Sequence, residues 1–132
     1  MLDHISIPVR EFAKAATFYD AVLATIGLKR TKEREGAIGY GTAVGLPPEF
    51  WILEQHDPSA ARSGVGLHVS FRVKSRAEVH AFHATALAQG GKDAGAPDVR
   101  SHYTAGFYGA FAYDLEGFKI EAVVREALPP GS

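Results

Sequence analysis

The feature that most constrains this chain is an internal repeat. When the sequence is compared with itself at an offset of 64 residues, the segment that begins at His4 aligns without a gap with the segment that begins at His68. Eight of the 24 aligned positions from 4 to 27 are identical. Self-similarity at a fixed offset is the signature of a repeated supersecondary unit. The chain is therefore predicted to contain two copies of one unit, each about half its length.

Each unit is predicted to begin with a strand and to continue with a helix. In residues 2–9 and 65–73, aliphatic side chains alternate with His and Ser, which is the period of a half-buried strand. Apolar residues at helical spacing follow in both units. Ser75 and Glu78 form a capping box that marks the start of the second helix, whereas residues 9–11 offer no comparable cap. Glycines at 27, 90 and 91 are typical of helix ends.

Three further strand-like segments are predicted in each unit. They lie at about 28–34, 37–44 and 49–54 in the first unit, and at about 97–102, 107–114 and 118–125 in the second. We therefore expect an α+β fold of two tandem βαβββ modules, which form a cupped mixed sheet with the helices on its outer face. Residues 1–132 are expected to form a single domain, with module 1 at about 1–56, a linker at 57–64 and module 2 at about 65–127.

Composition excludes several classes of function. The net charge is −1, so charge gives no reason to expect a nucleic-acid partner or an anionic membrane surface. No apolar run approaches the roughly 20 residues that span a bilayer, and the first residues do not resemble a signal peptide, so we expect a cytoplasmic protein. Cysteine is absent, which leaves His, Asp and Glu as protein ligands for any metal ion.

Two histidines and one glutamate are the candidate metal ligands. His4 and His68 occupy equivalent positions of the repeat, on the strand face opposite the aliphatic side chains. Approximate two-fold symmetry would bring them together on the concave side. In the last strand, Glu121 lies opposite the row of core residues. Two imidazoles and a carboxylate suit Zn, Fe, Mn or Ni. The alternative is that the histidines form ordinary hydrogen bonds and that Glu121 pairs with Lys119.

Four segments carry a resemblance to a known family. They are Leu2-Asp-His-Ile-Ser-Ile-Pro-Val9, Phe18-Tyr-Asp-Ala-Val-Leu-Ala-Thr-Ile-Gly-Leu28, Gly66-Leu-His-Val-Ser-Phe71 and Asp114-Leu-Glu-Gly-Phe-Lys-Ile-Glu-Ala-Val123. In this order they resemble the vicinal oxygen chelate superfamily, which includes glyoxalase I, bleomycin-resistance proteins, fosfomycin-resistance transferases and extradiol dioxygenases. The resemblance implies a divalent metal ion bound by His4, His68 and Glu121.

The same resemblance raises the question of a fourth ligand. Glyoxalases of the family carry a further Glu on the last strand of the first module, and Glu54 is the candidate here. Glu54 aligns with Glu121 at an offset of 67, but an offset of 68 places Leu53 there instead. The sequence does not decide between these two alignments.

The substrate pocket is expected to combine aromatic and polar side chains from both modules. The expected pocket residues are Tyr40, Trp51, Glu54, Ser70, His102, Tyr103 and Tyr108. Among them, His102 and Tyr108 are candidates for proton transfer, together with Glu121. The alternative for the aromatic residues is cross-strand or core packing. No basic patch suited to the carboxylates of glutathione is identifiable in the sequence.

Two classes of function follow. The first is a metal-dependent, glyoxalase-like or dioxygenase-like enzyme, whose small substrate chelates the ion through adjacent oxygens. The second is a non-catalytic protein that binds a drug or antibiotic, as bleomycin-resistance proteins do. A catalytically silent relative is a third possibility. A homodimer is expected, because sheets of this kind expose unpaired edges.

Overall fold

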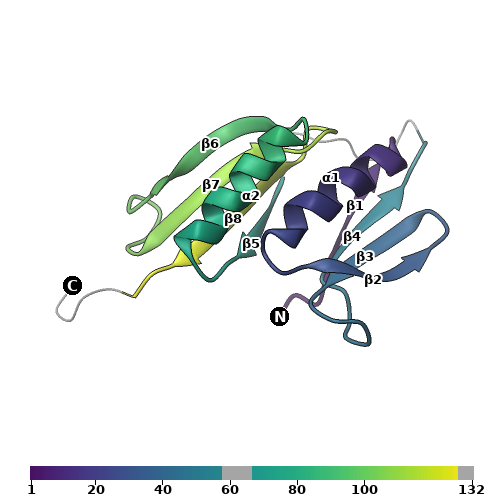
Figure 1. The fold of residues 1–132 in the computed structure, drawn as a ribbon, viewed down its shortest axis with the longest axis horizontal. Coiled ribbons are helices and arrows are strands. Elements are labelled where there is room, and N and C mark those ends of the chain that lie inside the picture. Colours follow the sequence, from purple (N-terminus) through teal and green to yellow (C-terminus); the bar gives the residue numbers. More distant parts are fainter. Residues whose placement is uncertain (58–66, 128–132) are drawn as a thin grey trace.

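The computed structural model describes residues 1–57 and 67–127. Module 1 contains β1 (Ile5–Val9), α1 (Phe12–Ala24), β2 (Lys29–Arg34), β3 (Ala37–Gly41) and β4 (Phe50–Glu54). Module 2 repeats the same order, with β5 (His68–Arg72), α2 (Arg76–Ala88), β6 (Lys92–Val99), β7 (Phe107–Tyr113) and β8 (Lys119–Arg125). The predicted succession of two βαβββ modules is confirmed (Figure 1). Residues 58–66, which include most of the expected linker, lie outside the described residues.

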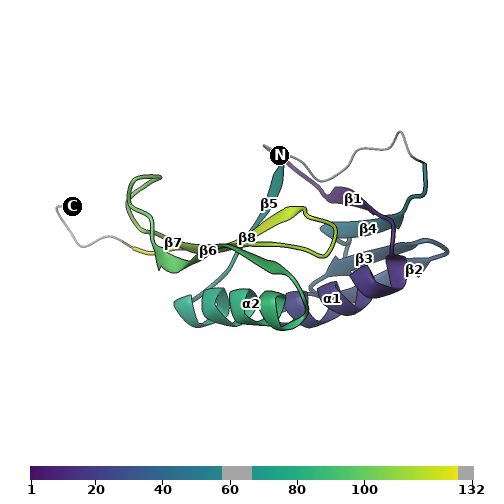
Figure 2. The ribbon, with the colours of Figure 1, turned by 90° about the horizontal axis from the view of Figure 1, so that it is seen from above.

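Each module forms its own four-stranded mixed sheet. The strand orders are β1-β4-β3-β2 and β5-β8-β7-β6, and in each sheet the first pair is parallel while the others are antiparallel. Both helices lie on the same side of the two sheets, where they pack against each other (Figure 2). The fold is therefore α+β, as expected. The expected cup is made of two sheets, and β1 and β5 are outer strands of these sheets.

The apolar core lies between the sheets and the helices. Alternation along β1 turns Ile7 and Val9 toward α1, and both are almost completely buried. The two modules share this core, because the ring centroids of Phe50 on β4 and Phe71 on β5 are 5.4 Å apart. The opposite face of each sheet carries both polar and aromatic side chains. Neither helix of the described residues combines the length and apolar character that crossing a bilayer needs.

The start of α1 is stabilised by the other module. Glu11 precedes the helix without a side-chain cap, which agrees with the missing cap signal in the sequence. Instead, the backbone amides of Arg10 and Glu11 donate hydrogen bonds to Oε2 of Glu116, at 2.5 and 3.0 Å. A carboxylate at a helix N-terminus also interacts favourably with the helix dipole. In α2, by contrast, the predicted local cap is confirmed, since Ser75 Oγ accepts a hydrogen bond from the Glu78 amide at 3.2 Å.

A second contact between the modules is buried. The Tyr19 hydroxyl donates a hydrogen bond of 2.5 Å to Asp114 Oδ2, and Asp114 Oδ1 accepts bonds from the amides of Glu116 and Phe118. Burial raises the pKa of Asp114 above its ordinary value, although these hydrogen bonds act in the opposite direction. The turn between β7 and β8 is thus tied to the middle of α1.

The sixth strand differs from the sequence-based expectation. It was expected at about 97–102, but β6 begins at Lys92 and ends at Val99. The strand contains Gly95 and Pro97, and its register with β7 shifts twice. Glycine and proline are tolerated in a strand that lies at the edge of a sheet and carries bulges. Because of these two residues, the sequence pattern did not identify the first part of the strand.

Candidate functional site

The centre of the candidate site is a buried carboxylate on the sheet of module 2. Glu121 lies on β8, with its side chain turned away from α2 and only 5% exposed. Its Oε1 atom lies 3.3 Å from His68 Nε2 on the neighbouring strand β5. Its Oε2 atom is buried and has no hydrogen-bond partner among the described residues. Buried polar atoms in native proteins nearly always have a partner, and an orphan therefore marks a place where a ligand would complete the structure.

The parallel ladder between β5 and β8 positions this pair. Ser70 lies directly opposite Glu121, and His68 lies opposite Lys119. Period-two alternation turns His68, Ser70 and Glu121 to the same face. Ser70 is exposed there, so its hydroxyl is available beside the carboxylate. The structure thus brings three of the expected site residues together.

His4 immediately precedes β1 of module 1, apart from this pair. Its side chain is half exposed, and its Nδ1 lies 2.5 Å from Asp3 Oδ2. It lines a shallow cavity of about 320 Å³ with Ser6 and Trp51, and a cleft of about 540 Å³ between the modules, to which Ser70 also contributes. Within residues 1–57 and 67–127, no three His, Asp or Glu side chains are close enough together to hold a metal ion. One chain therefore gathers two of the three expected ligands.

The register of the sheets bears on the question of the fourth ligand. In module 2, Glu121 pairs with Ser70 of β5. The repeat-equivalent residue of β1 is Ser6, and its partner on β4 is Trp51. Trp51, and neither Glu54 nor Leu53, therefore occupies the position that corresponds to Glu121. Glu54 pairs instead with the core residue Val9, and its carboxylate lies 3.5 Å from His56 Nε2. The structure does not support Glu54 as a ligand or as a pocket residue.

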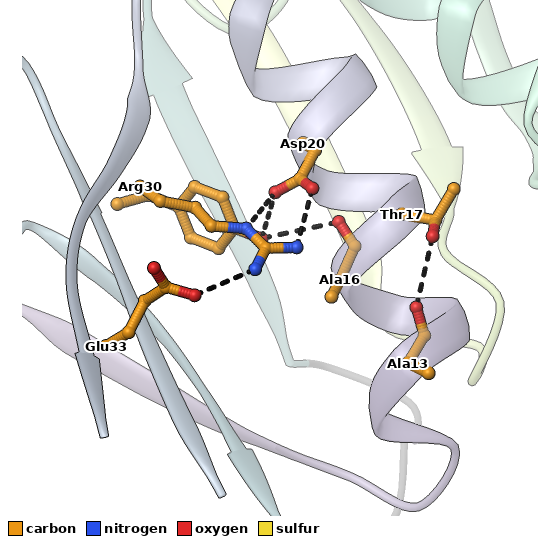
Figure 3. A network of polar contacts seen from close by, with 7 residues as sticks. Ala13, Ala16, Thr17, Asp20, Arg30 and Glu33 are labelled. Carbon is orange, nitrogen blue, oxygen red and sulfur yellow. Dashed lines mark hydrogen bonds and ion pairs between the residues drawn. The ribbon is translucent and has the colours of Figure 1, made fainter. Parts of the chain in front are cut away.

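Tyr40 and Tyr108 lie on the helix side of their sheets. The Tyr40 hydroxyl donates to Asp20 Oδ1 at 2.9 Å, within the polar network of Asp20, Arg30 and Glu33 (Figure 3). Burial and the Asp20 carboxylate raise the pKa of Tyr40 well above its ordinary value. The Tyr108 hydroxyl lies 2.7 Å from His80 Nε2 on α2. The parity of each strand turns both rings toward a helix, so the geometry supports neither as a pocket residue, nor Tyr108 as a proton donor to the site.

The loop between β6 and β7 lies over the face that carries Glu121. Tyr103 packs against Phe107 and Phe111, with ring centroids at 5.2 and 6.4 Å, and its own ring is 53% exposed. His102 packs on Tyr103 at 4.3 Å. The ladder places Phe111 directly opposite Glu121. Tyr103 therefore lies on the same face as Glu121, and His102 packs against it.

A group of cations that the sequence pattern did not indicate lies on this same face. Arg100 and Lys119 both lie over the Phe111 ring, at 5.1 and 4.7 Å from its centroid. Farther along β8, Arg125 lies over Phe107 at 4.8 Å. The sequence signal that could have revealed two of them is the alternation along β8, which places Lys119 and Arg125 on the same face as Glu121. These three residues are spread over seven positions of β8, and Arg100 is distant in sequence, so the cations form no basic run.

Comparisons with known proteins agree with this fold. A crystal structure of a glyoxalase/bleomycin resistance protein from Albidiferax ferrireducens T118 is 28% identical, with a TM-score of 0.83, over 95% of this chain and 99% of that one. A glyoxalase/bleomycin resistance protein/dioxygenase family enzyme from Burkholderia phytofirmans PsJN is 18% identical, with a TM-score of 0.72, over 94% and 98%. Fosfomycin resistance protein FosX from Mesorhizobium loti is 14% identical, with a TM-score of 0.65, over 97% and 93%.

The family itself is identified at the level of sequence. A comparison with curated proteins finds no match. The sequence profile of the glyoxalase family, however, matches residues 1–122, which include both modules and the His68–Glu121 pair. This chain therefore belongs to the Glyoxalase/Bleomycin resistance protein/Dioxygenase superfamily.

Proposed function

We propose that this protein is a metal-dependent enzyme of the glyoxalase or dioxygenase type, which acts on a small substrate with two adjacent oxygen atoms. The observation that carries the proposal is the buried Glu121 carboxylate, with one oxygen near His68 and the other without a partner. A buried charge is costly unless it is paired or ligates a metal. The donor set, one imidazole and one carboxylate, fits a divalent ion such as Zn, Fe, Mn or Ni.

The residues around the pair have distinct roles in this proposal. When bound, a divalent ion supplies Lewis-acid stabilisation of negative charge on substrate oxygens. His68 and Glu121 would hold the ion, and the exposed Ser70 hydroxyl would orient the substrate beside it. His102 and Tyr103, on the loop above this face, donate or accept protons.

The third ligand, His4, is proposed to come from a second copy of the chain. Within the described part of one chain, only two ligands lie together. Among the described residues, the outer strands β1 and β5 have no partner on one side, and unpaired strand edges favour association. A homodimer would join the His4 face of one protomer to the His68–Glu121 face of the other.

Metal analysis tests the proposal. Protein purified without chelator is expected to hold about one ion per chain, and His68→Ala and Glu121→Gln should lose it. His80→Ala is the matched control, because His80 lies in the same module but contacts Tyr108 on the helix side. Equal metal content in wild type and His68→Ala would overturn the proposal.

Mixing variants tests the shared site. Neither His4→Ala nor Glu121→Gln alone should bind metal tightly. After the two proteins are unfolded together and refolded, heterodimers would contain one intact site. Recovery of metal binding in the mixture supports a site built from two chains, and no recovery assigns His4 to the site of its own chain.

A non-catalytic binding protein remains the second candidate. Trp51 occupies the position that corresponds to Glu121, and it lines a cavity with His4, Ser6 and Arg34. The Arg34 guanidinium lies over the Trp51 ring at 4.9 Å. Such an aromatic cavity suits a flat drug-like molecule. Absence of bound metal after incubation with each candidate ion would favour this function over the enzymatic one.

A further inference from the structure

A pair of cations beside Glu121 indicates the charge of the substrate. Arg100 and Lys119 lie over one ring, Phe111, at 5.1 and 4.7 Å from its centroid. Phe111 lies directly opposite Glu121 in the β7–β8 ladder. The two positive charges and the proposed metal ligands therefore share one small area of the sheet.

The charge of Arg100 interacts with the Asp93 carboxylate, which is itself hydrogen bonded to His83 and to the Gly95 amide. Among the described residues, Arg100 and Lys119 form no ion pair. Asp98 is the acidic residue at the β6 edge of this face, and its carboxylate accepts a hydrogen bond from the Val99 amide. The ring of Phe111 is 6% exposed, so the cations lie against an apolar surface that strengthens their attraction for an anion.

The position of Arg100 is fixed by the backbone around it. Its Nη2 donates to the Ala96 carbonyl at 2.7 Å, and its Nε donates to the Gly109 carbonyl at 3.3 Å. These bonds leave Nη1 without an acceptor among the described residues. Gly95 makes room for the arrangement, since a Cβ atom there would lie 3.0 Å from both the guanidinium and the Phe111 ring. The guanidinium is thus held in place before any ligand arrives.

We infer that Arg100 and Lys119 bind an oxyanion group of the substrate, so that the substrate of this site is a small organic acid. This inference rests on the proposed function, because it places the chelating oxygens of the substrate at His68 and Glu121. The anionic group of the same molecule, a carboxylate or a phosphate, lies beside the Phe111 ring, where Arg100 and Lys119 supply the positive charge. The exposed ring of Tyr103 contacts its apolar part.

The test uses metal-free protein, so that the cations are measured without the ion. Benzoate and phenyl phosphate are the oxyanion probes, and benzamide is the neutral probe of the same shape as benzoate. Binding is followed by amide chemical shifts at low ionic strength. At least one oxyanion probe should saturate, with shifts centred on Phe111, and benzamide should bind about tenfold more weakly, since it makes no charge-assisted hydrogen bond. The tighter oxyanion identifies the preferred group.

Variants of Lys119 assign the binding to this pair. Lys119→Met keeps the apolar stem on Phe111 but removes the charge, and it should weaken oxyanion binding about tenfold, whereas Lys119→Arg should restore it. Arg125→Gln is the matched control on the same face, because Arg125 contacts Phe107, and it should change affinity less than about twofold. Arg100 also joins β6 to β7, so Lys119 is the better position to vary.

The outcomes separate this inference from the proposed function. Failure of both oxyanions to bind, equal binding of benzoate and benzamide, or an unchanged affinity in a folded Lys119→Met variant would overturn the inference. Metal binding that persists alongside such a failure leaves the metal proposal intact. Conversely, oxyanion binding that depends on Lys119, in a protein that takes up no metal, supports the anion site and overturns the metal proposal.

Discussion

Neutralising Glu121 should make the metal-free protein more stable. The substitution Glu121→Gln keeps the shape of a side chain that is 5% exposed and removes its negative charge. In the metal-free state the carboxylate has few direct partners, because Oε2 has no hydrogen-bond partner among the described residues and Oε1 has only the 3.3 Å contact with His68. The residue proposed to hold the metal is thus expected to destabilise the fold that presents it.

The expected gain can be worked from these contacts. Leaving a buried polar group without a partner costs about 1–3 kcal/mol, and more when it is charged. The amide of Gln remains imperfectly hydrogen bonded, so part of this cost persists. The half-exposed His68 recovers at most about 1 kcal/mol when it pairs with Glu121. The net gain on substitution is about 1 kcal/mol, which corresponds to an increase in Tm of about 3–5 °C for a chain of this size.

Thermal unfolding with and without metal measures the effect. In the presence of a chelator, Glu121→Gln should unfold at a higher temperature than wild type. With metal added, the order should reverse, because ligand binding stabilises only the protein that binds it. Glu54→Gln is the control, since Glu54 is exposed, and it should change stability by less than about 0.5 kcal/mol. A metal-free Glu121→Gln protein that is less stable than wild type would refute the reasoning.

Three further predictions concern the contacts between and within the modules. Tyr19→Phe removes the hydroxyl that bonds to Asp114 and should lower the free energy of unfolding in urea by about 1.5 kcal/mol; an unchanged value would contradict the importance of this bond. Burial raises the pKa of Asp114 above 3.8, so its stabilising contribution is complete below that pH and is lost as the pH rises through the folded-state pKa. Asp114→Asn should therefore gain stability relative to wild type between about pH 4 and pH 7, and a constant difference in urea unfolding over that range would argue against the raised pKa. Ser75→Ala should cost about 1 kcal/mol through loss of the helix cap, whereas Ser75→Asp should retain most of it; equal losses in both variants would show that the cap is not responsible.

Much of the fold follows from local pattern in the sequence. The repeat at an offset of 64 identified the two modules, and the Ser75–Glu78 pair marked the start of α2. Alternation along β5 and β8 also placed His68 and Glu121 on one face. These predictions succeeded because each depends on neighbours close in sequence, within one strand or one helical turn.

Strand parity was harder to predict where both faces of a strand are apolar. In β7, six consecutive residues from 107 to 112 are buried, so alternation gives no sign of which residues face α2. The sequence therefore does not show that Tyr108 lies on the helix side of the sheet. The same holds for the start of β4, where three buried residues precede Glu54. There the alignment of module 1 with module 2 follows from the backbone pairing of β1 with β4, which cannot be read from the sequence.

Contacts between distant segments were also beyond the sequence pattern. The amides at the start of α1 bond to Glu116, which is about a hundred residues away. The cations over Phe111 come from a loop and from another strand. Neither grouping forms a motif along the chain, and only the packed sheets bring the members together.

The cap that Glu116 provides has a consequence for how this protein can change over evolutionary time. The first half begins its helix on a carboxylate that belongs to the second half. A shortened gene that encoded the first half alone would leave those amides without their acceptor, and it would also lose the partner of Tyr19. Module 1 now depends on residues of module 2, so a deletion of module 2 would remove contacts that module 1 needs.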